Sequence, residues 1–189
     1  LFSSLVTPQP APAQSPVMSA LGTASAESGV SFAYLAETAR RESAFQPAAQ
    51  ARTSSARGLF QFIEQTWLSV VRSDGARFGL EQEAAAITAR GGRMSVADPA
   101  MRRHILALRD NPDLSARFAA VLADKNRQVL TGQLGRAPSD GELYIAHFLG
   151  VEGARRLIVL AETTPTTPAA GAFPAAARAN RSIFYGKNG

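Results

Sequence analysis

Residues 32–67 read FAYLAETARRESAFQPAAQARTSSARGLFQFIEQTW, and this stretch places one carboxylate on an apolar helical face. Its first part repeats apolar side chains at steps of three and four, and Glu42 falls in the same series as Phe32, Leu35, Ala36 and Ala39. Residues spaced in this way share one face of a helix, and an apolar face packs against the rest of a protein. The pattern therefore predicts Glu42 on the buried side of its helix.

Burial of Glu42 would change the chemistry of its carboxyl group. Loss of water and the negative carbonyl end of a helix both favour the protonated form of a carboxyl. A protonated carboxyl near neutral pH can donate its proton to a leaving group, as a general acid must. The alternative is a structural glutamate that is ion-paired with Arg52 or Arg57.

The helix that carries Glu42 has clear ends in the sequence. Ser31 is a suitable N-cap, and Pro47 prevents continuation of the helix beyond about residue 43. Residues 46–57 are small and polar, which is typical of a loop, and Gly58 would allow a close approach of the backbone to a neighbour.

The segment after Gly58 has helical apolar spacing from Leu59 to Val71, and we expect a buried helix there. Gln61 is the polar exception within it. A buried amide must find hydrogen-bond partners, so Gln61 either satisfies backbone groups or points into a cleft and binds a substrate amide.

Two motifs in this stretch resemble those of a known family. Glu42-Ser43 is followed by SSARGLFQ at residues 54–61. Their order and separation are similar to the first two motifs of lytic transglycosylases with the soluble-transglycosylase (SLT) domain, which are relatives of goose-type lysozyme. Phe60 stands where this family usually has Met, and Trp67 follows as in related sequences.

The resemblance implies an all-α, lysozyme-like domain in which Glu42 is the sole catalytic acid and base. It further implies a substrate groove lined by the turn that ends in Gln61. The residues that we expect to bind substrate are Ser43, Ser54, Phe60, Gln61, Tyr144 and His147.

A third family motif is altered in this chain. Ser139 and Glu142 form a capping box that starts a helix, and Gly150 can end it. Where the family has Ala-Tyr-Asn, this helix has Ala-His-Phe at residues 146–148. The family tyrosine touches the catalytic glutamate, so either His147 inherits this role or Tyr144, one turn earlier, supplies the hydroxyl.

The resemblance implies cleavage of the β-1,4 bond between N-acetylmuramic acid and N-acetylglucosamine of peptidoglycan, with a 1,6-anhydromuramoyl product. One alternative is a hydrolysing muramidase of the same fold. A non-catalytic peptidoglycan-binding or scaffold domain is another. A basic nucleic-acid binder is the least favoured, because no basic recognition helix is present.

The amino-acid composition limits the cofactors and partners that the protein can have. The 189 residues contain no cysteine and two histidines, so we expect neither a metal site nor a cofactor. The formal net charge is +5, which favours an anionic partner such as peptidoglycan with its peptide carboxylates. A cell-envelope assembly is a further partner compatible with the resemblance.

The remaining sequence predicts further helices and the domain limits. Asp98-Pro99 and Asn111-Pro112 are helix starts, residues 81–89 and 152–162 have helical patterns, and we find no pattern of a strand. We expect a flexible Pro-rich leader at residues 1–28, a catalytic domain at 29–162, and a linker with a C-terminal helix and tail at 163–189 that packs on the domain.

No apolar run is long enough to span a membrane. Residues 1–26 lack the basic start and apolar block of a signal peptide, so any export signal would precede Leu1. Because the expected substrate is peptidoglycan, the expected location is the periplasm or the cell exterior.

Overall fold

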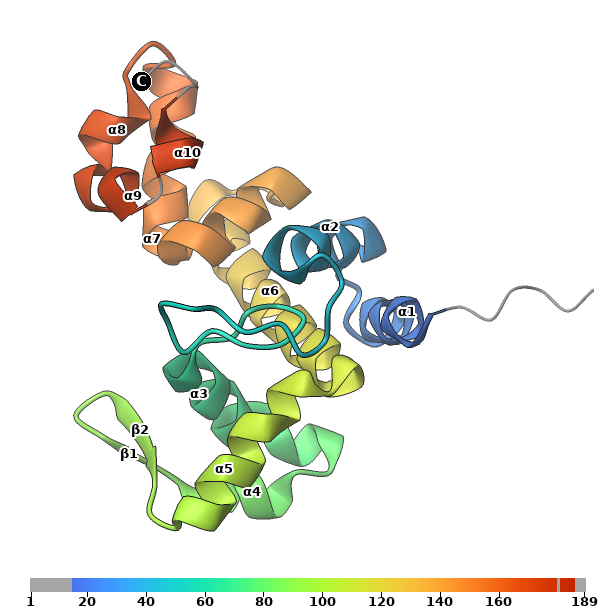
Figure 1. The fold of residues 1–189 in the computed structure, drawn as a ribbon. Helices are drawn as coiled ribbons and strands as arrows, with labels where there is room; N and C mark the ends of the chain where they lie inside the picture. The colour runs from blue at the N-terminus through green and yellow to red at the C-terminus, as the bar shows by residue number, and fades with distance from the viewer. Residues whose placement is uncertain (1–14, 180, 186–189) are drawn as a thin grey trace, which may run out of the picture.

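The computed structural model describes residues 15–179 and 181–185, and within them the protein is mainly helical (Figure 1). In chain order the elements are α1 (Pro16–Ser28), α2 (Phe32–Ser43), α3 (Glu64–Asp74), η1 (Gly75–Phe78), α4 (Glu81–Ala86), β1 (Ile87–Arg90), β2 (Arg93–Val96), α5 (Pro99–Ala107), η2 (Leu108–Asp110), α6 (Pro112–Leu134), α7 (Asp140–Thr163), α8 (Ala169–Ala172), α9 (Pro174–Ala179) and α10 (Arg181–Phe184). The all-α prediction is confirmed, with one antiparallel hairpin as an addition.

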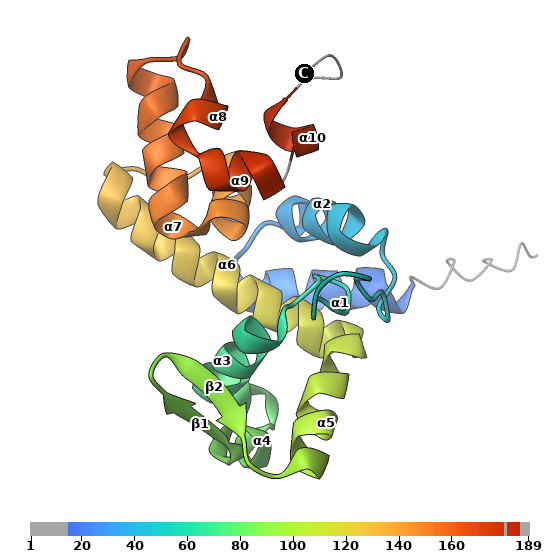
Figure 2. The ribbon, with the colours of Figure 1, turned by 60° about the vertical axis from the view of Figure 1, so that its left-hand side comes forward.

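The long helix α6 is the axis of the molecule. Helices α1, α2, α3 and α7 all pack against it. Figures 1 and 2 show α3, α4, α5 and the hairpin gathered at one end of α6, and α7 to α10 at the other end. The chain between α2 and α3 lies between these two ends and carries the second of the two sequence motifs.

The main core surrounds the N-terminal half of α6. Trp67 is fully buried, and its ring meets Phe62 and Phe118 edge-on at centroid distances of 5.2 and 5.1 Å. The indole N–H donates to the carbonyl of Ile105 at 2.7 Å, so the buried donor is satisfied. A smaller core joins α6 to α7, and its buried members are Leu130, Ala146, Ala154 and Ile158.

The prediction of a flexible leader is wrong for residues 16–28, which form α1. Ser15 caps this helix and Pro16 occupies its first turn, where a missing N–H costs nothing. Val17, Ala20, Leu21 and Ala24 are buried in the main core. The composition is rich in small residues, but α6 and α2 supply the apolar surface that orders it. The rest of the predicted leader, residues 1–14, lies outside the described residues.

Two further local predictions need correction. The helix expected from Leu59 begins only at Glu64, because residues 58–62 form a turn in which Gln61 has a φ of 47°. The helix expected at residues 81–89 ends at Ala86, and residues 87–96 form the β1–β2 hairpin. Its turn is Gly91-Gly92, with positive φ at both positions, which is the preferred geometry for a two-residue hairpin loop.

The predicted helix starts are confirmed. Ser31 accepts from the backbone N–H of Tyr34, Asp98 and Asn111 cap α5 and α6, and Ser139 forms the capping box with Glu142. Gly150 interrupts α7 with a φ of 72° and a ψ of 166°, so α7 is two helical segments joined at a kink. The division of the chain into domains stays a prediction, although the packing of α1 favours a folded unit that begins before residue 29.

Candidate active site

Glu42 lies in the last turn of α2, next to the C-terminal end of the helix. The helix ends at Ala44 in the left-handed conformation, with a φ of 50°, and the backbone N–H of Ala44 bonds the carbonyls of Ala39 and Arg40. The side chain of Glu42 is 26% exposed, so it is partly sheltered and still reaches solvent. Both features agree with the position expected from the periodicity.

His147 of α7 faces Glu42. Its Nε2 lies 3.5 Å from Oε1 of Glu42, and its side chain is about one-third exposed, at 34%. Tyr144 does not make this contact. Its ring stacks on that of His147 at 6.0 Å, and the Arg41 guanidinium lies over it at 5.2 Å. Burial and the nearby charge of Glu42 raise the pKa of Tyr144. Of the two alternatives left open by the sequence, His147 is the residue in contact with Glu42.

A groove of about 370 Å³ opens beside His147. It lies between the turn before α3, α3 itself, α6 and α7, and its lining residues are Phe60, Gln61, Phe62, Ile63, Thr66, Leu122, Asn126 and His147. No carboxylate belongs to this lining. Glu42 reaches the groove through its contact with His147 rather than as a lining residue.

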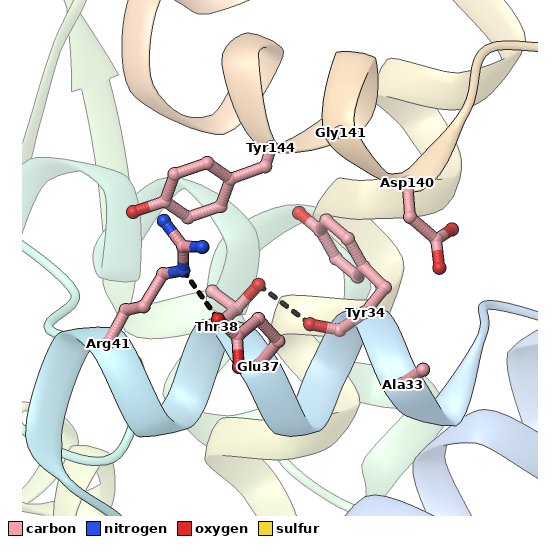
Figure 3. Close-up of a pocket in the computed structure, with 8 residues that line it drawn as sticks. All are labelled: Ala33, Tyr34, Glu37, Thr38, Arg41, Asp140, Gly141 and Tyr144. Atoms are coloured by element: carbon pink, nitrogen blue, oxygen red, sulfur yellow. Dashed lines mark hydrogen bonds and ion pairs between the residues drawn. The ribbon is translucent and has the colours of Figure 1, made fainter.

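A second hollow of about 290 Å³ lies between α2 and the start of α7. Figure 3 shows Glu37, Thr38 and Arg41 of α2 on one side and Tyr144 with Asp140 of α7 on the other. Thr38 is one helical turn before Glu42, and Arg41 directly precedes it. Glu42 is therefore next to this hollow along α2 and in contact with His147 of the groove, and it lines neither space.

Glu37 is the nearest carboxylate to Glu42 along α2, and it is already paired with arginines. It accepts hydrogen bonds from Arg40 and Arg41 at 2.7 to 2.8 Å. These bonds lower the pKa of Glu37 to about 2. The same carboxylate is about half exposed. Glu37 is thus an ionised surface group, unsuited to proton donation near neutral pH.

The amide nitrogen of Gln61 forms hydrogen bonds within the protein. Nε2 donates to the carbonyl of Gly58 at 2.9 Å and to that of Ala49 at 3.1 Å. Of the two expectations, backbone satisfaction is therefore correct for the nitrogen, while the amide oxygen receives no hydrogen bond from the described residues. Phe60 beside it is nearly fully buried and forms part of the apolar wall of the groove.

Ser43 and Ser54, which we expected to bind substrate, have other partners. The hydroxyl of Ser43 is buried and lies 2.8 Å from the carbonyl of Leu59 and 3.0 Å from that of Ala39. It joins α2 to the turn that carries Gln61 and does not reach the groove. Ser54 is exposed, and its hydroxyl accepts from the backbone N–H of Ala56. Neither residue lines the groove described above.

A clamp formed by Gly58, Arg109 and Asp110 supports the turn, and no sequence pattern indicated Arg109 or Asp110. Gly58 has a φ of 85°, and a Cβ there would lie 2.1 Å from the backbone oxygen of Arg109. The buried guanidinium of Arg109 donates to the carbonyls of Ser55 and Phe62 at 2.7 and 3.0 Å. Burial lowers the pKa of Arg109.

Asp110 completes the clamp through Arg57, whose Nε donates to it at 2.7 Å. This pair removes one of the two structural partners considered for Glu42, since Arg57 is committed elsewhere. The other, Arg52, is exposed and makes no ion pair with Glu42. The alternative of a purely structural glutamate is therefore disfavoured by the geometry.

The described residues contain no group of three or more His, Cys, Asp or Glu side chains arranged to hold a metal ion. Among the helices of residues 15–179 and 181–185, none combines the length and apolar character needed to cross a membrane.

A helical, lysozyme-like fold with a half-sheltered glutamate at a helix end beside a groove defines a class of glycan-cleaving proteins. Residues 19–84 of the chain match the model of the transglycosylase SLT domain. The resemblance to the SLT-type lytic transglycosylases is thereby confirmed. The matched segment contains Glu42 and Gln61, whereas Tyr144 and His147 lie beyond it.

The match also indicates the general role of the protein. An SLT domain supports glycan cleavage of the lytic transglycosylase kind, with peptidoglycan as the substrate class. Proteins with this domain act on peptidoglycan outside the cytoplasm.

Proposed function

We propose that the protein is a peptidoglycan lytic transglycosylase that cleaves the β-1,4 bond between N-acetylmuramic acid and N-acetylglucosamine. The product would be a 1,6-anhydromuramoyl end. The observation that carries the proposal is the partly sheltered Glu42 at the end of α2, 3.5 Å from a groove-lining histidine. Action in the periplasm or outside the cell follows from this substrate.

A single carboxyl group suits this reaction. Most glycosidases pair an acid with a second carboxylate on the other side of the bond. The groove lining contains no carboxylate that could pair with Glu42 in this way. Glu37 lies five residues before Glu42, which on an α-helix corresponds to a rotation of about 140°. Its pKa of about 2 also keeps it ionised and bound to arginines.

In the proposed reaction Glu42 acts twice. It first donates its proton to the glycosidic oxygen as the bond from that oxygen to C1 of the muramoyl sugar breaks. The resulting carboxylate then takes the proton of the C6 hydroxyl of the same sugar while O6 bonds to C1. Protons and bonds balance, Glu42 ends as it began, and no water is consumed.

The positive charge that develops on C1 needs stabilisation. We assign this to the N-acetyl group of the substrate, which can contact C1 from within the sugar. We further propose that Gln61, which lines the groove and whose amide oxygen receives no hydrogen bond from the described residues, accepts one from the N–H of such a group. The apolar wall at Phe60 would pack against a sugar face.

The test is analysis of the products. Purified protein is incubated with peptidoglycan sacculi, and the released muropeptides are separated and weighed by mass spectrometry. The proposal predicts anhydro ends, each lighter by one water than the corresponding reducing end. Reducing ends would identify a hydrolysing muramidase of the same fold. Binding without any cleavage would identify a glycan-binding domain and contradict the proposal.

A further inference from the structure

The β1–β2 hairpin projects from the end of the molecule that holds α3, α4 and α5 (Figure 2). Only its base is buried, at Ile87 and Val96, while Thr88 to Arg93 are all exposed. A two-stranded hairpin with so little buried surface has small intrinsic stability. Hydrogen bonds to α3 therefore matter for the position of the hairpin.

The tie consists of Gln65 on α3 and Met94 on β2. The side-chain amide of Gln65 donates to the carbonyl of Met94 at 3.1 Å and accepts from its N–H at 2.9 Å. Gln65 also lines, with Thr66, a shallow hollow on α3, and Thr66 is shared with the groove beside His147. The hairpin is therefore anchored to the helix that forms one wall of the groove.

The tip of the hairpin carries two arginines in an unfavourable arrangement. Arg90 and Arg93 are directly opposite each other in the antiparallel register, on either side of the Gly91-Gly92 turn. Like charges in directly opposed positions destabilise a hairpin. Neither guanidinium forms an ion pair or hydrogen bond with any described residue. Two positive charges thus lie opposite each other at the hairpin tip, and no carboxylate of the described residues pairs with them.

We propose that this arginine-tipped hairpin is a second contact with peptidoglycan, and that Arg90 and Arg93 bind carboxylates of its stem peptides. The inference rests on the proposed function, because it takes the same polymer as the partner. Guanidinium groups bind carboxylates with two parallel hydrogen bonds, which a stem peptide with free carboxylates can accept. The hairpin is tied through Gln65 to α3, which forms one wall of the groove, so we expect a strand bound in the groove to bring its peptides to the hairpin.

The test uses binding and removes turnover. In a Glu42→Gln background, retention by intact sacculi is compared with retention by sacculi whose free carboxylates have been converted to amides. Arg90→Gln with Arg93→Gln should weaken retention by intact sacculi about tenfold and leave retention by the amidated sacculi unchanged. Arg90→Lys with Arg93→Lys keeps the charge but not the two parallel hydrogen bonds, and should restore only part of the binding.

Two controls separate binding from folding. Arg155→Gln with Arg178→Gln removes the same charge from the opposite end of the molecule and should not change retention. The Arg90 and Arg93 glutamine variant should unfold at the same temperature as its parent or a higher one, because a repulsive pair has been removed. A fall in thermal stability together with binding would overturn the proposal.

The remaining outcomes are also decisive. Unchanged retention by intact sacculi, or an equal loss on both substrates, would overturn the hairpin proposal while product analysis could still support the enzyme. If the chain with Glu42 intact cleaves nothing but its retention depends on Arg90 and Arg93, the proposed function fails and the hairpin contact stands.

Discussion

The parts of the molecule at the N-terminal and C-terminal ends of α6 differ in how they are packed. On the N-terminal side, large aromatic residues and the buried guanidinium of Arg109 fix the turn before α3. On the C-terminal side, the core cluster formed by the described residues has four buried members, and Arg136 bridges Glu142 and Glu162 while 45% exposed. Dense packing with satisfied buried polar groups resists displacement, whereas exposed ion pairs contribute little.

This difference matters because the candidate site uses both sides. Glu42 belongs to the densely packed side, where Ser43 joins its helix to the Gln61 turn. His147 belongs to the lightly packed side, three residues before the kink at Gly150. We therefore expect substitutions on the first side to damage the fold, and those on the second to alter the contact between His147 and Glu42.

The largest effect on stability is expected at Gly58. An alanine Cβ there would overlap the backbone oxygen of Arg109 and would also require a φ of 85°. Gly58→Ala should lower the free energy of unfolding by about 3 kcal/mol or more. Gly135→Ala on the other side has a φ of 69° but open space around it, and should cost about 1 kcal/mol. Equal losses in denaturant titrations would remove the proposed contrast.

Arg109 provides the next test. Arg109→Met keeps the length of the side chain but leaves the carbonyls of Ser55 and Phe62 without their donor. We expect a loss of about 2 kcal/mol in unfolding free energy. Arg136→Met on the C-terminal side removes an exposed arginine and should cost less than about 1 kcal/mol. A larger loss at Arg136 than at Arg109 would reverse the ranking of the two sides.

His147 should affect catalysis more than stability. Its Nε2 lies 3.5 Å from Oε1 of Glu42, so the imidazole helps to position the carboxyl group that donates the proton. His147→Gln should therefore lower the rate of muropeptide release about tenfold and leave the free energy of unfolding within about 1 kcal/mol. Tyr144→Phe is the matched control, since its ring stacks on that of His147, and should lower the rate less. An unchanged rate in His147→Gln would reject a role for this contact.

The smallest effect on the free energy of unfolding is expected at Glu142, which caps α7. Hydrogen bonding to Arg136 lowers the pKa of Glu142 from 4.5 to about 2. Between these values the unfolded chain binds more protons than the folded one, so this contribution is present above pH 4.5 and is lost as pH falls toward 2. Glu142→Gln should cost about 1 kcal/mol at pH 7 and reduce the pH dependence in that window. The exposed Glu152→Gln should change neither quantity.

The sequence predicts local features well and long-range ones poorly. Ser31, Asp98, Asn111 and the Ser139 capping box could be identified because each helix start depends on residues a few positions away. Helix α1 was missed because its order comes from α6, about a hundred residues later. The Gly91-Gly92 hairpin was missed although its turn signal was present, since the flanking apolar pattern is too short.

The candidate site shows the same contrast between local and long-range features. Helical periodicity identified Glu42, and the altered third motif pointed to His147. Periodicity alone could not distinguish a helix from the turn at residues 58–62, because the turn depends on bonds from Arg109 to Phe62 and from Gln61 to Ala49, which are distant in sequence. The role of Arg109 had no local signal, since its partners are backbone carbonyls about fifty residues earlier. The bond from Ser43 to Leu59 had no local signal either, since the two residues are distant in sequence.

The most direct test of the account compares the two carboxylates of α2. Rates of release of soluble muropeptides from sacculi are measured for the unaltered protein, Glu42→Gln and Glu37→Gln. We predict a loss of about a thousandfold for Glu42→Gln, as for removal of a general acid and base, and a change within about threefold for Glu37→Gln. If Glu42→Gln keeps its activity, or if Glu37→Gln loses as much, Glu42 is not the sole acid and base.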